Sequence, residues 1–203
     1  MALYANLIDK ARREVREAPS EAIGNEIRSS VIEFCQRTRS WRDYQTIFLS
    51  PGQHEYRLRF LMEGRVDQVL SCDLRKGTEG RAIKKVEVTD RFKSGRPAYF
   101  SESPGYVRFS PVPDEDGYEA RLHVIYVPAV GSRTYPDFIY DEWREAVTAG
   151  AVSRLLLQPD RPWSNPDRGL YLEREFHLAV RDARQKAQSG NWVPQSIPLR
   201  RWV

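Results

Sequence analysis

Apolar side chains recur at helical spacing at both ends of the chain, and they alternate with polar ones in its middle. Near the N-terminus Leu3, Leu7 and Ala11 follow one another at four-residue intervals, which predicts a first helix. Ser20 is a good N-cap for a second helix that should end near residues 38–41. Because the connection between them is short, we expect the two helices to pack antiparallel.

Between residues 43 and 134 the apolar period falls to two. Tyr56, Leu58 and Phe60 alternate with charged residues, as expected of a half-buried strand. Similar patterns predict further strands at residues 44–49, 66–74, 83–88, 98–100, 106–109 and 121–127. Loops rich in glycine, proline and acidic residues separate these segments, which is typical of an antiparallel sheet or a small sandwich.

Helical spacing returns after Pro136 and predicts a third helix of roughly 20 residues. Gly150 inside it costs about 1 kcal/mol in helix propensity, and the close approach of another helix would justify that cost. Asn165 as N-cap and Pro166 at the first helical position begin a fourth helix that Gly190 should end. The following segment has two prolines and no periodicity, so we expect an extended arm.

The order of helices, strands and helices predicts an α+β fold. The simplest assembly is an antiparallel four-helix bundle with an antiparallel β-sheet or small β-sandwich inserted between helices two and three. The expected parts are a helical bundle of residues 1–42 and 135–190, a β insert of residues 43–134, and an extended C-terminal arm of residues 191–203.

Composition narrows the class of protein without indicating an activity. The 203 residues carry a net charge of +4, with 40% hydrophobic and 30% charged residues, which fits one domain with a large polar surface. No apolar run is long enough for a transmembrane helix or a signal peptide, so we expect neither membrane association nor secretion. Cys35 and Cys72 lack a C-x-x-C spacing and fit apolar patterns, so we expect buried, reduced thiols.

A search for catalytic and ligand-binding motifs finds only weak candidates. The three histidines, His54, His123 and His177, lie in different predicted elements and are interpreted as surface or structural residues, not metal ligands. Nucleophile-elbow, zinc-protease, phosphate-loop and dinucleotide motifs are missing from the sequence. Acidic clusters at residues 114–116 and 141–142 fit a turn and a helix start. Two carboxylates from distant segments that meet in space as a catalytic pair are an alternative that the sequence leaves open. We nevertheless predict that the protein is not an enzyme and has no cofactor or metal.

Residues 75–96 carry an excess of positive charge, with eight basic and three acidic side chains. The basic contact segment that we single out comprises Arg75, Lys76, Arg81, Lys84, Lys85, Arg91 and Lys93. Such a stripe is able to bind nucleic-acid phosphates. Two other interpretations are a solvated hairpin and a surface complementary to an acidic neighbour.

The predicted arm contains residue types that are enriched at binding hot spots. These are Trp192, Arg200, Arg201 and Trp202. Either the arm folds back onto the helices of its own chain, or it becomes ordered on a partner.

Several short motifs follow one another in a recognisable order. They are residues 32–42 at the end of the second helix, then 95–100, 107–113, 124–128, 150–156, 162–166 and 176–184. Together they cover nearly the whole chain and none of them is catalytic. In this order the chain resembles the head–tail adaptor proteins of tailed bacteriophages, called tail tubular protein A in some short-tailed phages.

The resemblance implies a structural virion protein of the head–tail interface that is assembled in the host cytoplasm. Such adaptors form a dodecameric ring beneath the portal, extend the DNA exit channel and provide the attachment platform for the tail. The implied partners are further copies of the chain, the portal protein, a tail nozzle or tube protein, and passing genomic DNA without sequence specificity. No membrane is implied.

By the same resemblance the arm lies against the portal and the basic contact segment lies against an acidic neighbouring subunit or near DNA. A strongly basic lumen would retard DNA, which favours the protein contact. Two alternatives remain: a tail terminator or completion protein, usually hexameric, and a DNA-binding protein that uses residues 75–96. A small hydrolase or lyase with dispersed acids is a third class, for which the sequence offers no support.

Overall fold

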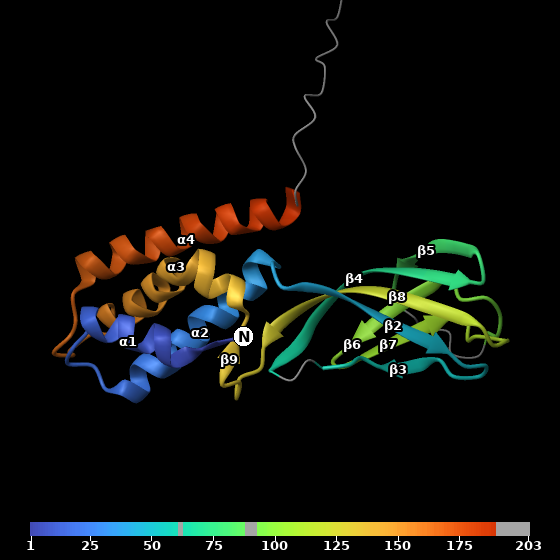
Figure 1. The fold of residues 1–203 in the computed structure, drawn as a ribbon, viewed down its shortest axis with the longest axis horizontal. Coiled ribbons are helices and arrows are strands. Elements are labelled where there is room, and N and C mark those ends of the chain that lie inside the picture. The colour runs from blue at the N-terminus through green and yellow to red at the C-terminus, as the bar shows by residue number, and fades with distance from the viewer. Residues whose placement is uncertain (61–62, 88–92, 190–203) are drawn as a thin grey trace, which may run out of the picture.

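The computed structural model describes residues 1–60, 63–87 and 93–189. Helices lie at one end of an elongated molecule and most of the strands at the other (Figure 1). The described helices are α1 (Tyr4–Glu14), α2 (Ser20–Thr38), α3 (Asp137–Leu156) and α4 (Pro166–Ser189). The described strands are β1 (Ala2–Leu3), β2 (Arg42–Leu49), β3 (Glu55–Arg57), β4 (Gly64–Lys76), β5 (Glu79–Lys85), β6 (Tyr99–Ser103), β7 (Tyr106–Ser110), β8 (Tyr118–Pro128) and β9 (Thr134–Tyr135).

The apolar faces of the four helices meet in one hydrophobic cluster. Phe34 of α2 is fully buried there, and its ring centroid lies 5.6 Å from that of Trp143 and 6.5 Å from that of Phe176. Where α3 passes α2 and α4, a Cβ atom on Gly150 would lie 2.7 Å from Phe176 and from the Ser30 hydroxyl. The close approach expected at this glycine is therefore present.

Of the two predicted N-caps, Asn165 is confirmed and Ser20 is not. The Asn165 side chain accepts a hydrogen bond of 3.2 Å from the backbone N–H of Arg168, as an N-cap does. Ser20, in contrast, is the first residue of α2 and caps nothing, because its hydroxyl accepts a bond from Arg12. None of the described helices combines the length and apolar character needed to cross a membrane.

A short ribbon ties the N-terminus to the segment that precedes α3. Strands β1 and β9 pair antiparallel, with Ala2 opposite Tyr135. The Tyr4 ring lies 5.0 Å from the Tyr135 ring, and both side chains are buried in the helical cluster. The Tyr4 hydroxyl is 3.4 Å from the Ser132 hydroxyl.

Because these two tyrosines are buried, we expect the stability of the protein to fall at alkaline pH. Burial raises the pKa of Tyr4 to about 12 and also raises the pKa of Tyr135. In the unfolded chain a tyrosine ionises near pH 10. The stability that Tyr4 contributes is thus complete below about pH 10 and is lost as the pH rises through about 12, and the raised pKa of Tyr135 acts in the same direction. We expect Tyr4 to account for roughly 2 kcal/mol of that loss. Urea denaturation across this range should show a shallower fall for Tyr4→Phe; an unchanged slope would contradict the assignment.

The remaining strands form a second hydrophobic cluster inside a seven-stranded sheet. Its order is β2-β8-β4-β5-β6-β7-β3, and every pair is antiparallel except β5 with β6, which is parallel. Cys72, Phe100 and Leu122 are among its buried side chains. The burial predicted for both cysteines is confirmed, because Cys35 is equally buried in the helical cluster.

Side chains join the two edge strands of the sheet. The Tyr56 hydroxyl of β3 bonds to the backbone of Ser50, just after β2. Gln45 of β2 donates a 2.7 Å hydrogen bond to the carbonyl of Arg59 and accepts a 2.9 Å bond from its N–H. The Gln45 amide also donates to the Tyr126 hydroxyl. The sheet is therefore nearly closed on itself.

This architecture corrects the predicted fold class. The chain does not form a four-helix bundle with a small antiparallel insert; it forms a large, nearly closed mixed sheet together with helices. β4 and β8 are 13 and 11 residues long, and β4 carries register shifts between Val66 and Gln68 and between Val69 and Ser71. Such bulges increase the local twist and bend the sheet. Alternation along one strand carries no information about these pairings, so the size and closure of the sheet were missed.

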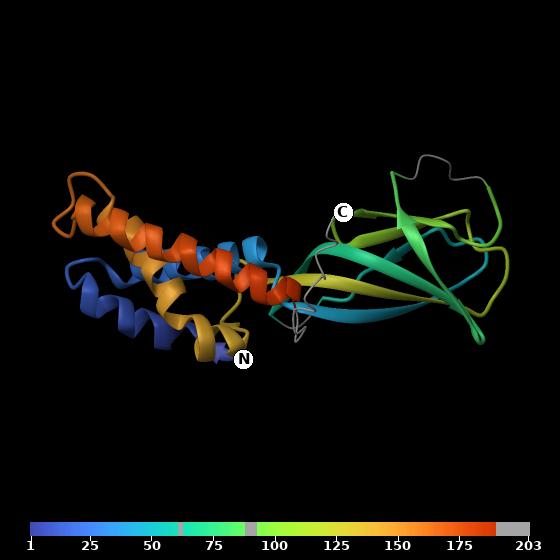
Figure 2. The ribbon, with the colours of Figure 1, turned by 90° about the horizontal axis from the view of Figure 1, so that it is seen from above.

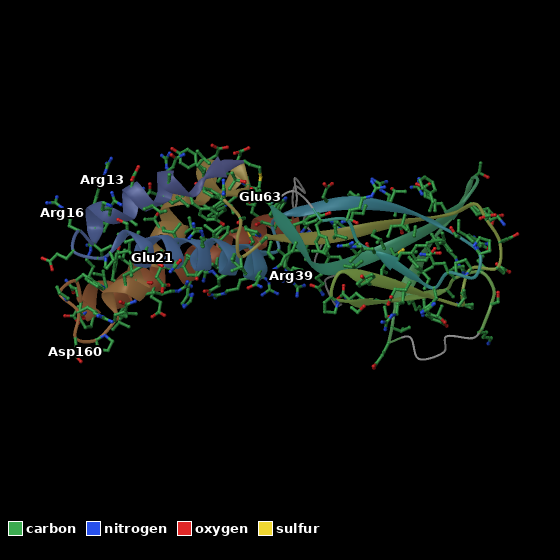
Figure 3. All side chains as sticks on the ribbon, turned by 90° about the horizontal axis from the view of Figure 1, so that it is seen from below. Arg13, Arg16, Glu21, Arg39, Glu63 and Asp160 are labelled. Carbon is green, nitrogen blue, oxygen red and sulfur yellow. The ribbon has the colours of Figure 1, made fainter. Side chains whose placement is uncertain are left out.

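The passage from helices to sheet is closely packed. Arg39, in the left-handed conformation, follows the last residue of α2. Figure 3 shows Arg39 and Glu63 on opposite edges of the molecule, where the helical end passes into the sheet. The Trp41 ring lies 5.6 Å from the Tyr126 ring, and a Cβ atom on Gly64 would be only 2.6 Å from Trp41. Glu63 accepts a 2.7 Å bond from the backbone N–H of Arg133.

Candidate interaction surfaces

Most of the predicted basic contact segment lies on the β4–β5 hairpin, at the end of the molecule far from the helices (Figure 1). Arg75 and Lys76 end β4, and Arg81, Lys84 and Lys85 lie on β5. Lys93 is exposed in the loop before β6, and Arg91 lies outside the described residues. Arm residues Trp192, Arg200, Arg201 and Trp202 also lie outside the described residues.

Part of this positive charge is paired within the chain. Lys85 forms an ion pair with Glu102 of β6 and donates a 3.0 Å bond to the carbonyl of Val69. Arg81 donates a 2.8 Å bond to the carbonyl of Pro97. These side chains hold β5 against its neighbours and are less available to a partner.

Lys76 is engaged in the same way at the end of the hairpin. It pairs with Glu115 and lies 4.9 Å from the centroid of the Tyr118 ring. The hydrogen bond from Lys76, followed by that from Tyr118, lowers the pKa of the Glu115 carboxyl. Arg75, Lys84 and Lys93 are the exposed cations of the segment among the described residues with no such contact given by the structure.

A surface on the outer face of β2 and β8 was missed by the sequence analysis. Tyr44 stacks on His123 with ring centroids 4.7 Å apart, and the Arg121 guanidinium lies 4.3 Å from the Tyr44 centroid. Burial, followed by the nearby Arg42 charge, lowers the pKa of His123, which favours the neutral ring. Phe48, on the same face of β2, is 75% exposed. The only signal of this surface in the sequence was the spacing of Tyr44 and Phe48, which lie four residues apart in one predicted strand.

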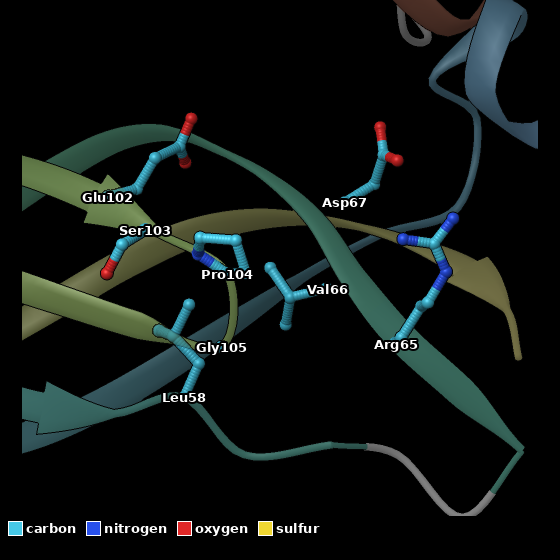
Figure 4. Close-up of a pocket in the computed structure, with 8 residues that line it drawn as sticks. All are labelled: Leu58, Arg65, Val66, Asp67, Glu102, Ser103, Pro104 and Gly105. Carbon is cyan, nitrogen blue, oxygen red and sulfur yellow. The ribbon is translucent and has the colours of Figure 1, made fainter.

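A hollow of about 270 Å³ lies between β4 and the β6–β7 turn (Figure 4). Its two carboxylates are already engaged. Glu102 accepts a 2.6 Å bond from the N–H of Val69 besides its ion pair with Lys85. Asp67 accepts a 3.4 Å bond from Gln36. Both carboxylates thus serve to join elements of the fold.

The remaining candidate chemistry is dispersed through the described part of the chain. His177 Nδ1 lies 2.9 Å from Arg37, far in sequence from the stacked His123, and His54 lies before β3. The described residues contain no group of three or more His, Cys, Asp or Glu side chains able to hold a metal ion.

The sequence of the chain matches the model of one known protein family. The model of the SU10 adaptor protein family matches residues 2–197, which span the helices and the whole sheet. The chain belongs to this family. The predicted resemblance to phage head-to-tail adaptors is thereby confirmed, and the adaptor is a bacteriophage structural protein.

Membership of this family also indicates where the protein acts and what it contacts. It implies a component of the virion that interacts with the portal and the tail, and it suggests a structural role in place of an enzymatic one. No curated protein matches the adaptor.

Proposed function

We propose that copies of this adaptor form a ring beneath the portal that extends the DNA exit channel and provides the attachment platform for the tail. The observation that carries the proposal is the family match, which includes both the helical end and the sheet. A ring needs two different surfaces on each subunit, one for each neighbour. An elongated chain with separate helical and β ends offers such surfaces and leaves others for portal and tail.

The two ends receive different roles in this proposal. Residues 1–42 with 135–190 form the portal-facing part, and residues 43–134 face outward or toward the tail nozzle or tube protein. Two separate hydrophobic clusters support this division. The arm of residues 191–203 contacts the portal through Trp192, Arg200, Arg201 and Trp202. Assembly takes place in the host cytoplasm, and genomic DNA later passes without sequence-specific contacts.

Sedimentation tests the proposed ring. The purified adaptor is run alone and mixed with the portal ring at moderate salt. We expect a species near the 23.6 kDa subunit mass alone and about twelve copies on each portal ring. A chain that ends at Gly190 should lose portal binding. Six copies in the absence of a portal would favour a tail terminator, and no binding to any portal would refute the adaptor ring.

The exposed part of the basic contact segment is proposed to face an acidic neighbouring subunit. The double variant Arg75→Glu, Lys84→Glu should weaken ring assembly on the portal by roughly tenfold, because it places like charges across the contact. Its matched control, Arg75→Lys, Lys84→Arg, keeps the charge and should assemble normally. Gel-shift assays of the same variants with DNA complete the comparison. Normal assembly with lost DNA binding would assign this surface to DNA instead.

A further inference from the structure

A groove runs along the exposed side of α3, next to α4. Figure 2, seen from above, shows α3 passing between α4 and α1. The groove has a volume of about 410 Å³, with Ala146 and Ala149 among its lining residues. Trp143, Tyr171 and Leu172 also line it, and Tyr171 is 61% exposed. An exposed apolar groove is a candidate contact site for another segment of chain.

The groove continues into a smaller hollow of about 90 Å³ that α1 also lines. Glu145, Ala149 and Leu172 belong to both, so the two form one path across α3. Thr148 lines the smaller hollow; it is 4% exposed, and its hydroxyl has no hydrogen-bond partner among the described residues.

The charge around the groove is acidic. Glu142, Glu145 and Glu175 line its rim. Glu142 is paired with Lys186, and Glu145 with Lys10 and Arg144, which partly neutralises the rim. Glu175 has no ion pair among the described residues and keeps its charge free. The arm of residues 191–203 has the complementary composition, with two tryptophans, two arginines and no acidic side chain.

The arm begins close enough to reach the whole groove. α4 ends at Ser189, ten residues beyond Ala179 in the groove, which is about 15 Å along the helix axis. From Ser189 to Tyr171 the same rise gives about 27 Å. Thirteen extended residues span up to roughly 43 Å, so the arm can reverse direction and still pass both points. Gly190 and Asn191 are residue types that permit such a reversal at a helix C-terminus.

We propose that in the free subunit the arm of residues 191–203 turns back along α4 and occupies the α3–α4 groove of its own chain. Trp202 packs beside Tyr171 and Leu172, and the arginines that precede it lie beside the acidic rim. The groove then holds the arm away from other contacts until the portal competes for it. This inference goes beyond the ring proposal, and it concerns the subunit before assembly.

Disulfide trapping in the full-length free protein tests this position. Ser196→Cys is combined with Ala179→Cys in the groove or with the control Arg181→Cys. Successive helical residues are about 100° apart, so Arg181 points nearly opposite to Ala179. It is also more exposed and two residues closer to the arm. The native cysteines are buried and do not compete.

We expect an intramolecular disulfide to form at least tenfold faster with Ala179→Cys than with Arg181→Cys, since the docked arm raises the local thiol concentration in the groove. Adding Arg200→Glu and Arg201→Glu should remove this preference. Equal rates, or faster reaction at the control position, would overturn the proposal. A disulfide-linked dimer would also overturn it, by assigning the arm to a second copy. Glu175→Cys, on the exposed rim, replaces Ala179→Cys if that variant does not fold. Because no portal is present, the result is independent of the ring proposal.

Discussion

Replacing Gly150 with alanine is expected to lower the free energy of unfolding by about 2 kcal/mol, although alanine is the better helix former. The added Cβ would lie 2.7 Å from the Phe176 ring and 2.7 Å from the Ser30 hydroxyl. Ser30 is itself held by a 2.7 Å hydrogen bond to the carbonyl of Val147. Both side chains are buried, and Ser30 would lose its hydrogen bond if it turned away, so the cost of overpacking should exceed the gain in propensity.

Gly24→Ala is the matched control for this variant. Gly24 also lies inside a helix, but its added Cβ would meet Ile8 at 3.5 Å and Arg28 at 3.7 Å, which are ordinary contacts. In this variant the gain in helix propensity should exceed any packing cost and stabilise the protein by up to about 1 kcal/mol. Urea denaturation of both variants measures the two changes. Stabilisation by Gly150→Ala would show that the helices do not cross as closely as described.

Replacing Gln45 with leucine should destabilise the adaptor by about 3 kcal/mol. Leucine matches the size of glutamine but removes both hydrogen bonds to the Arg59 backbone and the bond to the Tyr126 hydroxyl. Gln45 is only 7% exposed, so water does not readily replace these partners. The variant leaves polar groups unpaired where the Gln45 side chain joins the two sheet edges.

Gln53→Leu is the control for the loss of a glutamine amide. Gln53 is exposed and donates a 2.9 Å bond to the carbonyl of Glu55. Its replacement should change the free energy of unfolding by less than about 0.5 kcal/mol. Denaturant titration, followed by near-ultraviolet circular dichroism of the aromatic residues in the sheet, measures both variants. Equal effects of the two substitutions would mean that Gln45 contributes nothing to closure.

Charge in the candidate site could be predicted only in part. The excess of basic residues in the segment 75–96 is a property of the sequence. Its partial neutralisation is not, because Glu102 and Glu115 come from segments outside it and reach Lys85 and Lys76 only in the folded chain. Counting charges along the chain therefore overstated the free positive surface.

The sequence by itself determined the local elements and the family. Helical spacing placed α3 and α4 closely, and Asn165 marked the start of α4, because these signals act within one or two turns. The order of short motifs indicated a phage adaptor, which the family match confirms. Tertiary structure alone decided the closure of the sheet, the parallel β5–β6 pair, the stacked Tyr44 and the groove beside α3. Each of these depends on contacts between residues far apart in the chain, and no periodicity along a single segment records which distant segment it will meet.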